Sequence, residues 1–329
     1  MGMTVAVIGA GSWGTALAVQ LARVGHRVVL WGRSSAQMAR IGAERANPRY
    51  LPGVPIPAEV TPVADLELAR SADELLVAVP SHAFRQTLAA LGPGVRSLVW
   101  ATKGLEEGTG RLLHEVARDL LGEEARLAAL SGPTFAAEVA RGLPTAVTVA
   151  ASEIAYADRI AAALHGGAFR VYTSPDLIGV GLGGAVKNVI AIAAGMADGL
   201  RLGSNSRAAL ITRGLAEIMR LGARLGARGE TLMGLAGLGD LVLTCTDDQS
   251  RNRRFGLALA HGDSATKAAE QIAQVVEGAY AAAAVSLLAQ RHGIELPICE
   301  QVDRVLREEA NPRQAVAALL DRARRSEHD

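Results

Sequence analysis

The sequence predicts an α/β domain over residues 1–180 followed by an all-helical domain over residues 181–329. Strand-like and helix-like segments alternate as far as residue 173, and a glycine-rich turn joins the first strand to the first helix. From Asp176 onward no convincing strand pattern is present, so the domain boundary is expected near residues 175–185.

Composition and charge indicate a small-molecule protein. Half of the 329 residues are hydrophobic, a fifth are charged and the formal net charge is +1, which favours neither nucleic acid nor an anionic membrane as a partner. The two cysteines, Cys245 and Cys299, form no CxxC pair or metal-ligand cluster, so we expect no metal and a reducing compartment. With no signal peptide and no uninterrupted apolar run of ~18 residues, a soluble cytoplasmic protein is predicted. The basic run Arg322–Arg325 is interpreted as a solvated helix tail.

The first strand, Thr4–Ile8, leads into the turn Gly9-Ala-Gly11-Ser12-Trp13-Gly14. A helical pattern over residues 15–24 and a second strand, His26–Trp31, follow on schedule, which makes this GxGxxG a strong dinucleotide fingerprint. Gly9 allows the tight turn, Gly11 lets the backbone approach a pyrophosphate, and Gly14 lets the helix lie close to the sheet. The helix N-terminus then faces the phosphates.

The end of the second strand bears on the choice between NAD and NADP. An acid that binds the ribose hydroxyls is usual there when NAD is preferred, but Trp31 is followed by Gly32, Arg33 and Ser34. A guanidinium beside a hydroxyl fits a 2′-phosphate, so NADP should be accepted. Alternatively, Arg33 stacks on adenine.

Further strands are expected at residues 75–80, 97–103, 127–130, 145–151 and 169–173, with helices at residues 83–91 and 154–164. Residues 47–57 are too rich in proline for a helix and predict an ordered loop, in which Tyr50 contacts either the cofactor or the protein core. Lys103 lies at a strand end, where ligands of parallel sheets bind. Thr134 is a plausible cap for a helix that begins near Phe135.

The stretch Leu182–Asp198 predicts a buried helix, since only Lys187 and Asn188 interrupt its apolar residues. A buried ammonium must reach solvent, pair with an acid or face a polar cavity. Only three of the 34 basic residues are lysines, and a chain that prefers arginine keeps lysine where a proton must come and go near neutral pH. Lys187 and Lys103 are therefore candidate site residues, while Lys267 looks exposed; a structural lysine is the alternative.

A second unusual stretch begins at Gly234. Three glycines precede Asp240, which suggests a backbone that must approach another element closely. Asp240 is flanked by apolar residues, so it should be paired, and Lys187 is a plausible partner whose pKa it would set.

Ser250 is predicted to cap a helix, leaving the amides of Arg251 and Asn252 at the positive helix end beside a guanidinium. That combination suits a phosphate monoester. The alternative is an ordinary capped helix with solvated arginines. Glu277 could reach the nicotinamide ribose or face water, and Cys245 is interpreted as a small buried residue.

Five motifs occur in the order found in bacterial NAD(P)-dependent sn-glycerol-3-phosphate dehydrogenases, which the chain resembles over nearly its full length. The motifs are Gly9-Ala-Gly-Ser-Trp-Gly14, Gly132-Pro-Thr-Phe-Ala-Ala-Glu138, Gly184-Ala-Val-Lys-Asn-Val-Ile190, Gly237-Leu-Gly-Asp240 and Ser250-Arg-Asn252. The resemblance implies a Rossmann-type domain, then an all-α domain like the C-terminal domain of 6-phosphogluconate dehydrogenase. It also implies a homodimer that interconverts dihydroxyacetone phosphate and glycerol 3-phosphate for phospholipid synthesis.

Motif matching carries the family's site residues over to this sequence. Lys187 would donate and accept the proton, with Lys103 and Asp240 as further catalytic groups. Cofactor contacts beyond the glycines would be Ser12, Trp13, Arg33, Tyr50, Lys103, Ala136, Arg251, Val275 and Glu277. Substrate contacts would be Lys103, Gly132, Thr134, Lys187, Asn188, Asp240, Ser250, Arg251 and Asn252. Thr134 stands where many relatives carry Ser, and Gly181 where many carry Glu.

Two other functions remain possible on the sequence. A dehydrogenase of another small hydroxyacid would share the first domain and a catalytic lysine, but it needs a carboxylate clamp where this chain has Ser250-Arg-Asn252. A regulatory protein that binds NAD(P) without turnover would have no use for a lysine and an aspartate in apolar surroundings.

Overall fold

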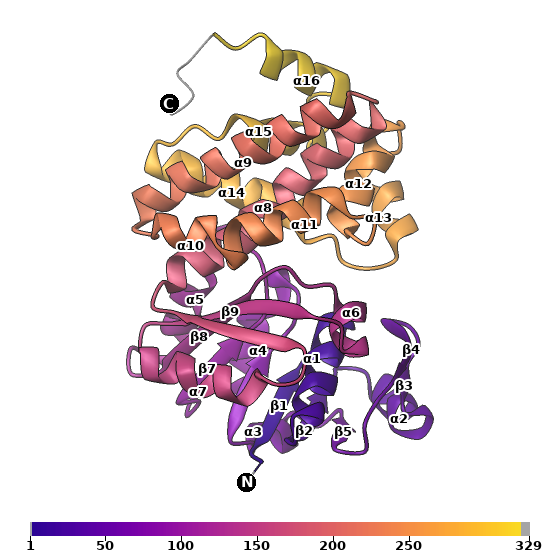
Figure 1. The fold of residues 1–329 in the computed structure, drawn as a ribbon, viewed down its shortest axis with the longest axis vertical. Helices are drawn as coiled ribbons and strands as arrows, with labels where there is room; N and C mark the ends of the chain where they lie inside the picture. Colours follow the sequence, from indigo (N-terminus) through magenta and orange to yellow (C-terminus); the bar gives the residue numbers. More distant parts are fainter. Residues whose placement is uncertain (1, 324–329) are drawn as a thin grey trace. The chain divides into compact units, whose positions relative to one another are not determined.

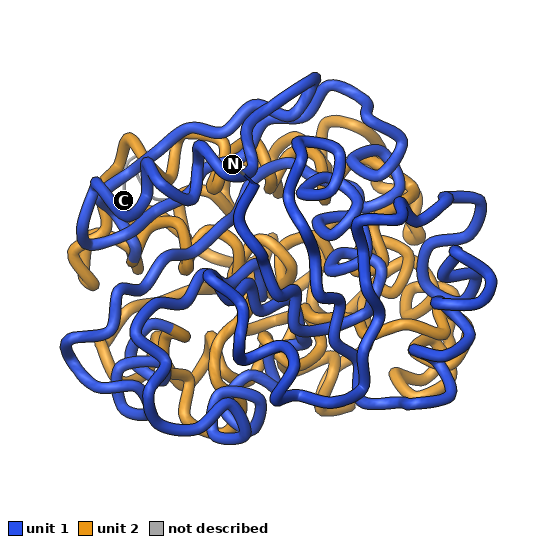
Figure 2. The backbone as a smooth tube through the Cα atoms, turned by 90° about the horizontal axis from the view of Figure 1, so that it is seen from below, with its two compact units in different colours: residues 1–102, 114–177 blue, residues 103–113, 178–329 orange. Residues whose placement is uncertain are grey.

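An eight-stranded β-sheet organises the first of two structural units. The computed structural model describes residues 2–323, which divide into a unit made of residues up to 102 with 114–177 and a second made of 103–113 with those from 178 onward (Figure 2). The chain divides after Leu177, inside the range of residues 175–185 in which the boundary is expected. Residues 103–113, which the predicted first domain of residues 1–180 includes, group with the second unit.

The strand order of the sheet is β10-β9-β8-β7-β6-β1-β2-β5. Figure 1 labels β1, β2, β5, β7, β8 and β9 among these strands. Every neighbouring pair is parallel except β8 and β9, which are antiparallel. This is the Rossmann-type arrangement that the sequence predicts. The strands are β1 (Thr4–Ile8), β2 (Arg27–Trp31), β5 (Val60–Val63), β6 (Glu74–Val77), β7 (Ser97–Trp100), β8 (Arg126–Ser131), β9 (Thr145–Ala151) and β10 (Phe169–Ser174).

Apolar side chains of these strands, such as Val5, Val7 and Leu30, pack against buried residues of the helix α1 and form one core. α1 also contacts two further helices, α6 and α7. The helices of this unit are α1 (Ser12–Arg23), α2 (Ser35–Glu44), α3 (Leu66–Arg70), a 3-10 turn η1 (Ser81–Ala83), α4 (Phe84–Leu91), α5 (Leu113–Leu121), α6 (Ala136–Arg141) and α7 (Ile154–Leu164).

Residues 47–57 are not the loop that the sequence predicts. The strands β3 (Ala46–Asn47) and β4 (Leu51–Pro55) form a small antiparallel pair there. The edge strand β5 was also not predicted. It contains Pro62, and a proline is tolerated in an edge strand because the missing N–H is not needed for a second neighbour.

The second unit is helical throughout its described residues after 177, as predicted. Its elements are α8 (Leu177–Gly199), α9 (Gly203–Leu225), α10 (Gly229–Met233), a π-helical turn η2 (Leu235–Gly239), α11 (Asp240–Thr246), α12 (Arg251–Ala260), α13 (Ala265–Ile272), α14 (Glu277–His292), α15 (Pro297–Leu306) and α16 (Pro312–Leu320). Of the basic run Arg322–Arg325, the last two residues lie outside the described residues.

Glycines let the backbone of α8 touch its neighbours. A Cβ on Gly195 of α8 would lie 2.0 Å from the carbonyl oxygen of Arg253 in α12, and one on Gly256 of α12 would lie 2.0 Å from that of Ile192. A Cβ on Gly278, in the first turn of α14, would lie 2.6 Å from the carbonyl oxygen of Asn188. Neither α12 nor α14 could approach α8 so closely with a larger residue at these positions.

α8 is long and apolar enough, despite Lys187 and Asn188, to meet the length and hydropathy requirements of a membrane span. However, 89% of its apolar window is buried within the protein, and its residues belong to the apolar core of the second unit. α8 is therefore the buried core helix that the sequence predicts.

Candidate active site

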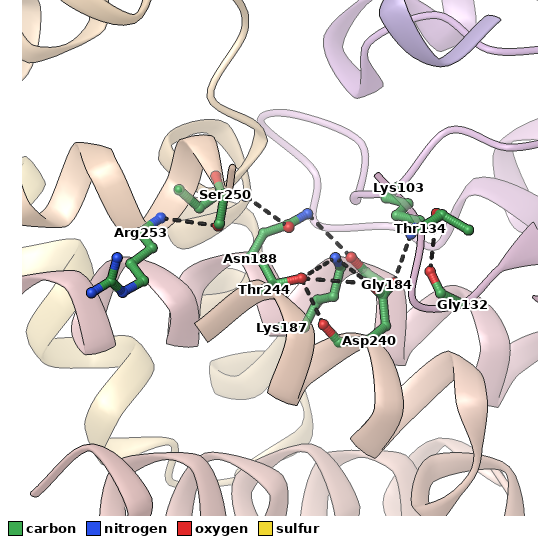
Figure 3. Close-up of polar contacts among 11 residues, drawn as sticks. Lys103, Gly132, Thr134, Gly184, Lys187, Asn188, Asp240, Thr244, Ser250 and Arg253 are labelled. Carbon is green, nitrogen blue, oxygen red and sulfur yellow. Dashed lines mark hydrogen bonds and ion pairs between the residues drawn. The ribbon is translucent and has the colours of Figure 1, made fainter. Parts of the chain in front are cut away.

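The ammonium of Lys187 is buried inside the second unit and paired with an acid. Lys187 is 5% exposed, and its Nζ donates to Oδ1 of Asp240 and to Oγ1 of Thr244, both at 2.7 Å (Figure 3). A buried lysine can reach solvent, pair with an acid or face a polar cavity, and Lys187 pairs with an acid. Its partner is Asp240, as the sequence predicts.

The carboxylate of Asp240 is shared between two lysines. Asp240 is 1% exposed, and its Oδ2 accepts from Nζ of Lys103 at 2.6 Å while Oδ1 accepts from Lys187. Two positive charges and one negative charge therefore meet in a largely desolvated cluster. Within such a cluster the net positive charge can stabilise a developing oxyanion.

Burial lowers the pKa of Lys187 to about 8. The negative charge of Asp240 opposes this shift, while the positive charge of Lys103 adds to it. Because a general acid or base works best when its pKa lies near the operating pH, this lysine can both give and take a proton under physiological conditions.

Glycines allow the close backbone packing that positions Asp240 beside Lys187. A Cβ on Gly183 of α8 would lie 2.6 Å from the carbonyl oxygen of Ala236, and one on Gly237 would lie 1.9 Å from that of Leu232. The π-helical turn η2 is therefore packed backbone to backbone against α8, and α11 begins at its end with Asp240. The close approach inferred from the glycines before Asp240 is confirmed.

Thr244 belongs to the cluster, although the sequence analysis did not single it out. It lies one turn after Asp240 on α11, donates to the Asp240 carbonyl oxygen at 2.6 Å and accepts from Lys187. The signal for it was the spacing of four residues, which puts two polar side chains on one face of a helix.

Ser250 caps α12, as predicted, by accepting from the amide of Arg253 at 3.2 Å. The preceding amides, those of Arg251 and Asn252, belong to the first turn, where N–H groups have no partner inside the helix. This turn presents them at the positive end of the helix dipole.

Arg251 and Arg253, two of the three arginines that follow Ser250, have different partners. Arg253 pairs with Asp198, with Nη2 to Oδ2 at 2.6 Å, and with Asp248. Arg251 forms no ion pair within the described part of the chain, and its Nη1 donates a hydrogen bond to the neutral side chain of Gln274 at 3.4 Å. Burial lowers the pKa of the Arg251 guanidinium, and the charge of Glu277 opposes the shift. Of these two, Arg251 therefore keeps the capacity to bind an anion.

The side-chain amide of Asn252 is already engaged in the protein. It donates to Oδ1 of Asn188 at 2.8 Å and accepts from the amide of Gly278 at 2.9 Å. Asn188 in turn donates to the carbonyl oxygen of Gly184. These bonds tie α12 and α14 to α8, so the side chain of Asn252 is occupied within the protein and its backbone amide is the group left for a ligand.

Glu277 is the first residue of α14, and half-buried Val275 lies just before it. Among the other predicted side chains of this unit, burial raises the pKa of the Cys245 thiol to about 12. Such a thiol stays protonated, which agrees with the interpretation of Cys245 as a small buried residue. Lys267 is exposed, as expected.

In the first unit, the glycine turn has the geometry of a phosphate cradle. Gly9 adopts a φ of +121°, and a Cβ on Gly14 would lie 1.8 Å from the Gly9 carbonyl oxygen. Gly11 is the N-cap of α1 without a side-chain cap, and a Cβ placed on it meets no atom within 4 Å. The α1 amides, beginning with Ser12, are thus left for a ligand.

A buried donor near this turn also lacks a partner. Among residues 2–323, the indole Nε1 of Trp13 has no hydrogen-bond partner, although Trp indoles usually find one when buried. The open turn and this unpaired donor fit a bound dinucleotide. The turn is braced by Asn47, whose Nδ2 donates to the Ala10 carbonyl oxygen at 3.0 Å and to Oγ1 of Thr15 at 2.8 Å. Sequence reasoning missed Asn47 because a polar residue in a proline-rich stretch carries no specific signal.

Arg33 is exposed just after β2, and its neighbour Ser34 caps α2 by accepting from the amide of Gln37. The hydroxyl that was expected to assist Arg33 thus already accepts one hydrogen bond. Tyr50 lies between β3 and β4, with the guanidinium carbon of Arg49 at 5.2 Å from its ring centre.

Thr134 does not cap α6, contrary to the prediction. Phe135 occupies the N-cap position, and the Thr134 hydroxyl donates to the carbonyl oxygen of Gly132 at 3.1 Å. Gly132 has a φ of +151°, and a Cβ there would lie 2.9 Å from the Cα of Val147, so the chain turns sharply before Ala136 starts the helix. Within residues 2–323, no group of three or more His, Cys, Asp or Glu side chains could hold a metal ion.

Two family models match the chain. Residues 4–157 match the N-terminal model of NAD-dependent glycerol-3-phosphate dehydrogenase, and residues 176–317 match the C-terminal model of the same family. The relatives of similar length include glycerol-3-phosphate dehydrogenase [NAD(P)+] of Pseudoalteromonas translucida, 57% identical with 98% of each chain covered. The enzyme of that name from Aeromonas hydrophila is 56% identical, with 99% of each chain covered.

Solved structures agree with these relatives. The crystal structure of glycerol-3-phosphate dehydrogenase from Coxiella burnetii superposes with a TM-score of 0.94 at 49% identity, covering 98% of this chain and 99% of that one. A ketopantoate reductase from Ralstonia eutropha has a TM-score of 0.58 at 16% identity over 95% of this chain and 100% of its own, a likeness of fold alone.

Proposed function

The chain belongs to the family of NAD-dependent glycerol-3-phosphate dehydrogenases, and we propose that Lys187 is the group that moves the proton in their reaction. The activity is the NAD(P)-dependent interconversion of dihydroxyacetone phosphate and sn-glycerol 3-phosphate. The observation that carries the proposal is a buried amine that donates to a carboxylate which is itself almost fully buried, and burial lowers the pKa of this amine toward neutrality.

Nicotinamide, when bound, supplies or accepts the hydride. Gly9, Gly11 and Gly14, with the amides of Ser12 and Trp13, would hold the pyrophosphate, and Arg33 would contact the 2′-phosphate of NADP. Further cofactor contacts are proposed for Tyr50, Lys103, Ala136, Arg251, Val275 and Glu277.

In the reductive direction, the carbonyl oxygen at C2 of dihydroxyacetone phosphate becomes an alkoxide as C2 gains a hydride. The ammonium of Lys187 gives its proton to this oxygen, and in the oxidative direction the neutral amine removes the alcohol proton. Lys103 adds positive charge beside the same oxygen, while Asp240 holds both amines in position.

The phosphate of the substrate would bind at the start of α12. The guanidinium of Arg251 and the amides of Arg251 and Asn252 offer charge and donors together, with Ser250 shaping the turn. Gly132, Thr134 and Asn188 are proposed to border the rest of the substrate. Fixing the phosphate would restrict where C2 can lie, which is the purpose of a non-reacting anchor.

Replacing Lys187 tests the proposal. We expect Lys187→Ala and Lys187→Arg to lose ~10²–10⁴-fold in kcat, since an alanine has no proton to give and a guanidinium cannot release one near pH 7. Turnover is followed as NADH oxidation with dihydroxyacetone phosphate. NADH affinity should be retained, and thermal unfolding shows that each variant is folded at the assay temperature. Lys267→Arg, the same change at an exposed lysine, is the matched control. Near-normal turnover of either Lys187 variant would reject the role.

We further propose a cytoplasmic homodimer that supplies glycerol 3-phosphate for phospholipid synthesis, without nucleic acid or stable membrane partners. Residues 1–180 would bind the dinucleotide and residues 181–329 would supply substrate-binding and catalytic groups. The two buried free thiols, Cys245 and Cys299, support a reducing compartment. A molar mass of a single subunit by light scattering would contradict the dimer.

A further inference from the structure

The segment that carries Lys103 packs in the helical unit, although in sequence it connects β7 and α5, which belong to the first unit. Residues 103–113 group with the second unit, and Leu105 and Leu112 are buried in the same apolar core as residues of α8 and α14. Lys103 is the first residue of this segment and contacts Asp240.

Residues 105–112 close on themselves. Leu105 and Leu112 form an antiparallel bridge, the amide of Glu106 donates to the Arg111 carbonyl oxygen at 2.9 Å, and the amide of Gly110 donates to the Glu106 carbonyl oxygen at 2.9 Å. A loop tied in this way moves as one piece, so a contact at its tip affects the residues at its base.

The tip of this loop rests on the backbone of α14. Gly110 has a φ of +67°, and a Cβ on it would lie 2.6 Å from the carbonyl oxygen of Ala284 and 3.2 Å from the amide nitrogen of Leu288. One turn further along, the guanidinium of Arg291 donates to the carbonyl oxygen of Thr109.

The same helix also contacts α8 beside the other amine. Gly278, in the first turn of α14, lies against the carbonyl oxygen of Asn188, the residue after Lys187. One rigid helix of 16 residues therefore touches the backbone next to Lys187 at one end and the Lys103 loop further along.

We propose that residues 105–112 form a clip on α14 and that Gly110 and Arg291 are positioning residues, which hold Lys103 against Asp240. The proposal rests on the function assigned above to Lys103 and Lys187. Neither positioning residue touches the reacting groups, and each acts through the place it gives to one ammonium.

The clip should influence the titration of Lys187. The groups that act on this amine are Asp240, Lys103 and the thiol of Cys245, and among them the positive charge of Lys103 lowers the pKa of Lys187. If the loop shifts and takes Lys103 away, that effect is lost and the pKa rises. A role confined to folding would leave the pKa unchanged.

Two glycines of the clip provide a matched test. Gly110→Ala places a Cβ against α14, whereas Gly108, with a φ of +74°, has no atom within 4 Å of a Cβ. Both substitutions strain a left-handed residue, but only the first pushes the loop off the helix. For Gly110→Ala we expect kcat to fall at least about 10-fold, as misplaced groups commonly cause. The pH limb of glycerol 3-phosphate oxidation, which is the rise of its rate with pH as Lys187 loses a proton, should move to higher pH. Gly108→Ala should stay within about twofold of the parent enzyme in kcat, since its Cβ meets open space.

A double substitution separates this proposal from the function it rests on. In a Lys103→Ala background, Gly110→Ala should have no further effect on kcat if it acts through Lys103. An additive loss, or an unmoved pH limb, would overturn the clip while leaving the roles of Lys103 and Lys187 intact. Unimpaired turnover of Lys103→Ala itself would overturn both.

Arg291→Ala provides a second test of the proposal in case the Gly110→Ala variant does not fold. Loss of one hydrogen bond to Thr109 should lower kcat about 2- to 10-fold and shift the pH limb in the same direction. Gln290→Ala, at the exposed neighbour on α14, should do neither. Equal behaviour of the two variants would contradict the proposal.

Discussion

Oδ1 of Asp240 accepts a hydrogen bond from Nζ of Lys187 at 2.7 Å, and the second oxygen of the same carboxylate accepts from Lys103. Burial lowers the pKa of Lys187, and Asp240 limits how far it falls. The carboxylate thus keeps two buried ammonium groups together and sets the proton affinity of one of them.

Asp240→Asn should reveal how far the charge of Asp240 raises the pKa of Lys187 against the effect of burial. The amide keeps the shape of the side chain but removes the negative charge, so the pKa of Lys187 should fall below about 8. The pH limb of glycerol 3-phosphate oxidation should move to lower pH, the opposite of the shift expected for Gly110→Ala. Two ammonium groups left without a counter-charge should also cost ~3–5 kcal/mol of unfolding free energy, measured in urea. A limb that moves upward would contradict the assigned electrostatics.

The unmodified enzyme should itself titrate near pH 8. Oxidation needs the neutral amine, so its rate should rise with pH through about 8, and reduction needs the ammonium, so its proton-transfer step should slow above that pH. Rates in both directions, measured between pH 6 and 10, test this. A midpoint near the ordinary lysine value of 10.5 would show that burial does not control this amine.

Arg251→Ala should weaken phosphate binding without abolishing chemistry. Loss of charged hydrogen bonds, ~1.5–3 kcal/mol, should raise KM for dihydroxyacetone phosphate by about 10- to 100-fold with a smaller effect on kcat. Activity on unphosphorylated dihydroxyacetone should change little. Arg254→Ala, at the exposed arginine of the same helix, is the control. An equal loss with both substrates would place Arg251 elsewhere in the reaction.

The sequence predicted those parts of the site in which a buried charge or an unpaired backbone amide would otherwise cost free energy. A lysine in an apolar helix needs an acid, which pointed to Asp240, and an uncapped helix start needs a hydroxyl, which pointed to Ser250. Thr244 was missed because a hydroxyl on a helix has many uses. The attachment of residues 103–113 to the helical unit could not be predicted either, because it depends on a contact between Gly110 and α14 that has no local pattern. The strand β5 was missed because it contains a proline, which argues against a strand unless the strand lies at the edge of a sheet. The edge position of β5 is known only from the fold.

Arg33→Ala should separate the two cofactors. An exposed guanidinium after β2 can pair with the 2′-phosphate of NADPH, whereas NADH has only a hydroxyl there. We expect the KM for NADPH to rise about 10-fold or more while that for NADH changes by less than about threefold. Parallel losses with both cofactors would indicate that Arg33 stacks on adenine instead.

Gly11→Ala should separate cofactor binding from folding in the glycine turn. Gly11 has a φ of −79°, which alanine adopts readily, and its added Cβ meets no protein atom within 4 Å. The unfolding free energy should therefore change by less than about 0.5 kcal/mol, whereas NADH should bind at least about 10-fold more weakly because the methyl group occupies the space over the α1 N-terminus. Gly14→Ala is the contrasting variant, since its Cβ would lie 1.8 Å from the Gly9 carbonyl oxygen and must disturb the turn itself. Titration of NADH by fluorescence, together with thermal unfolding of both variants, distinguishes the two effects. Normal NADH affinity in a stable Gly11→Ala variant would mean that the pyrophosphate does not approach the backbone at this glycine.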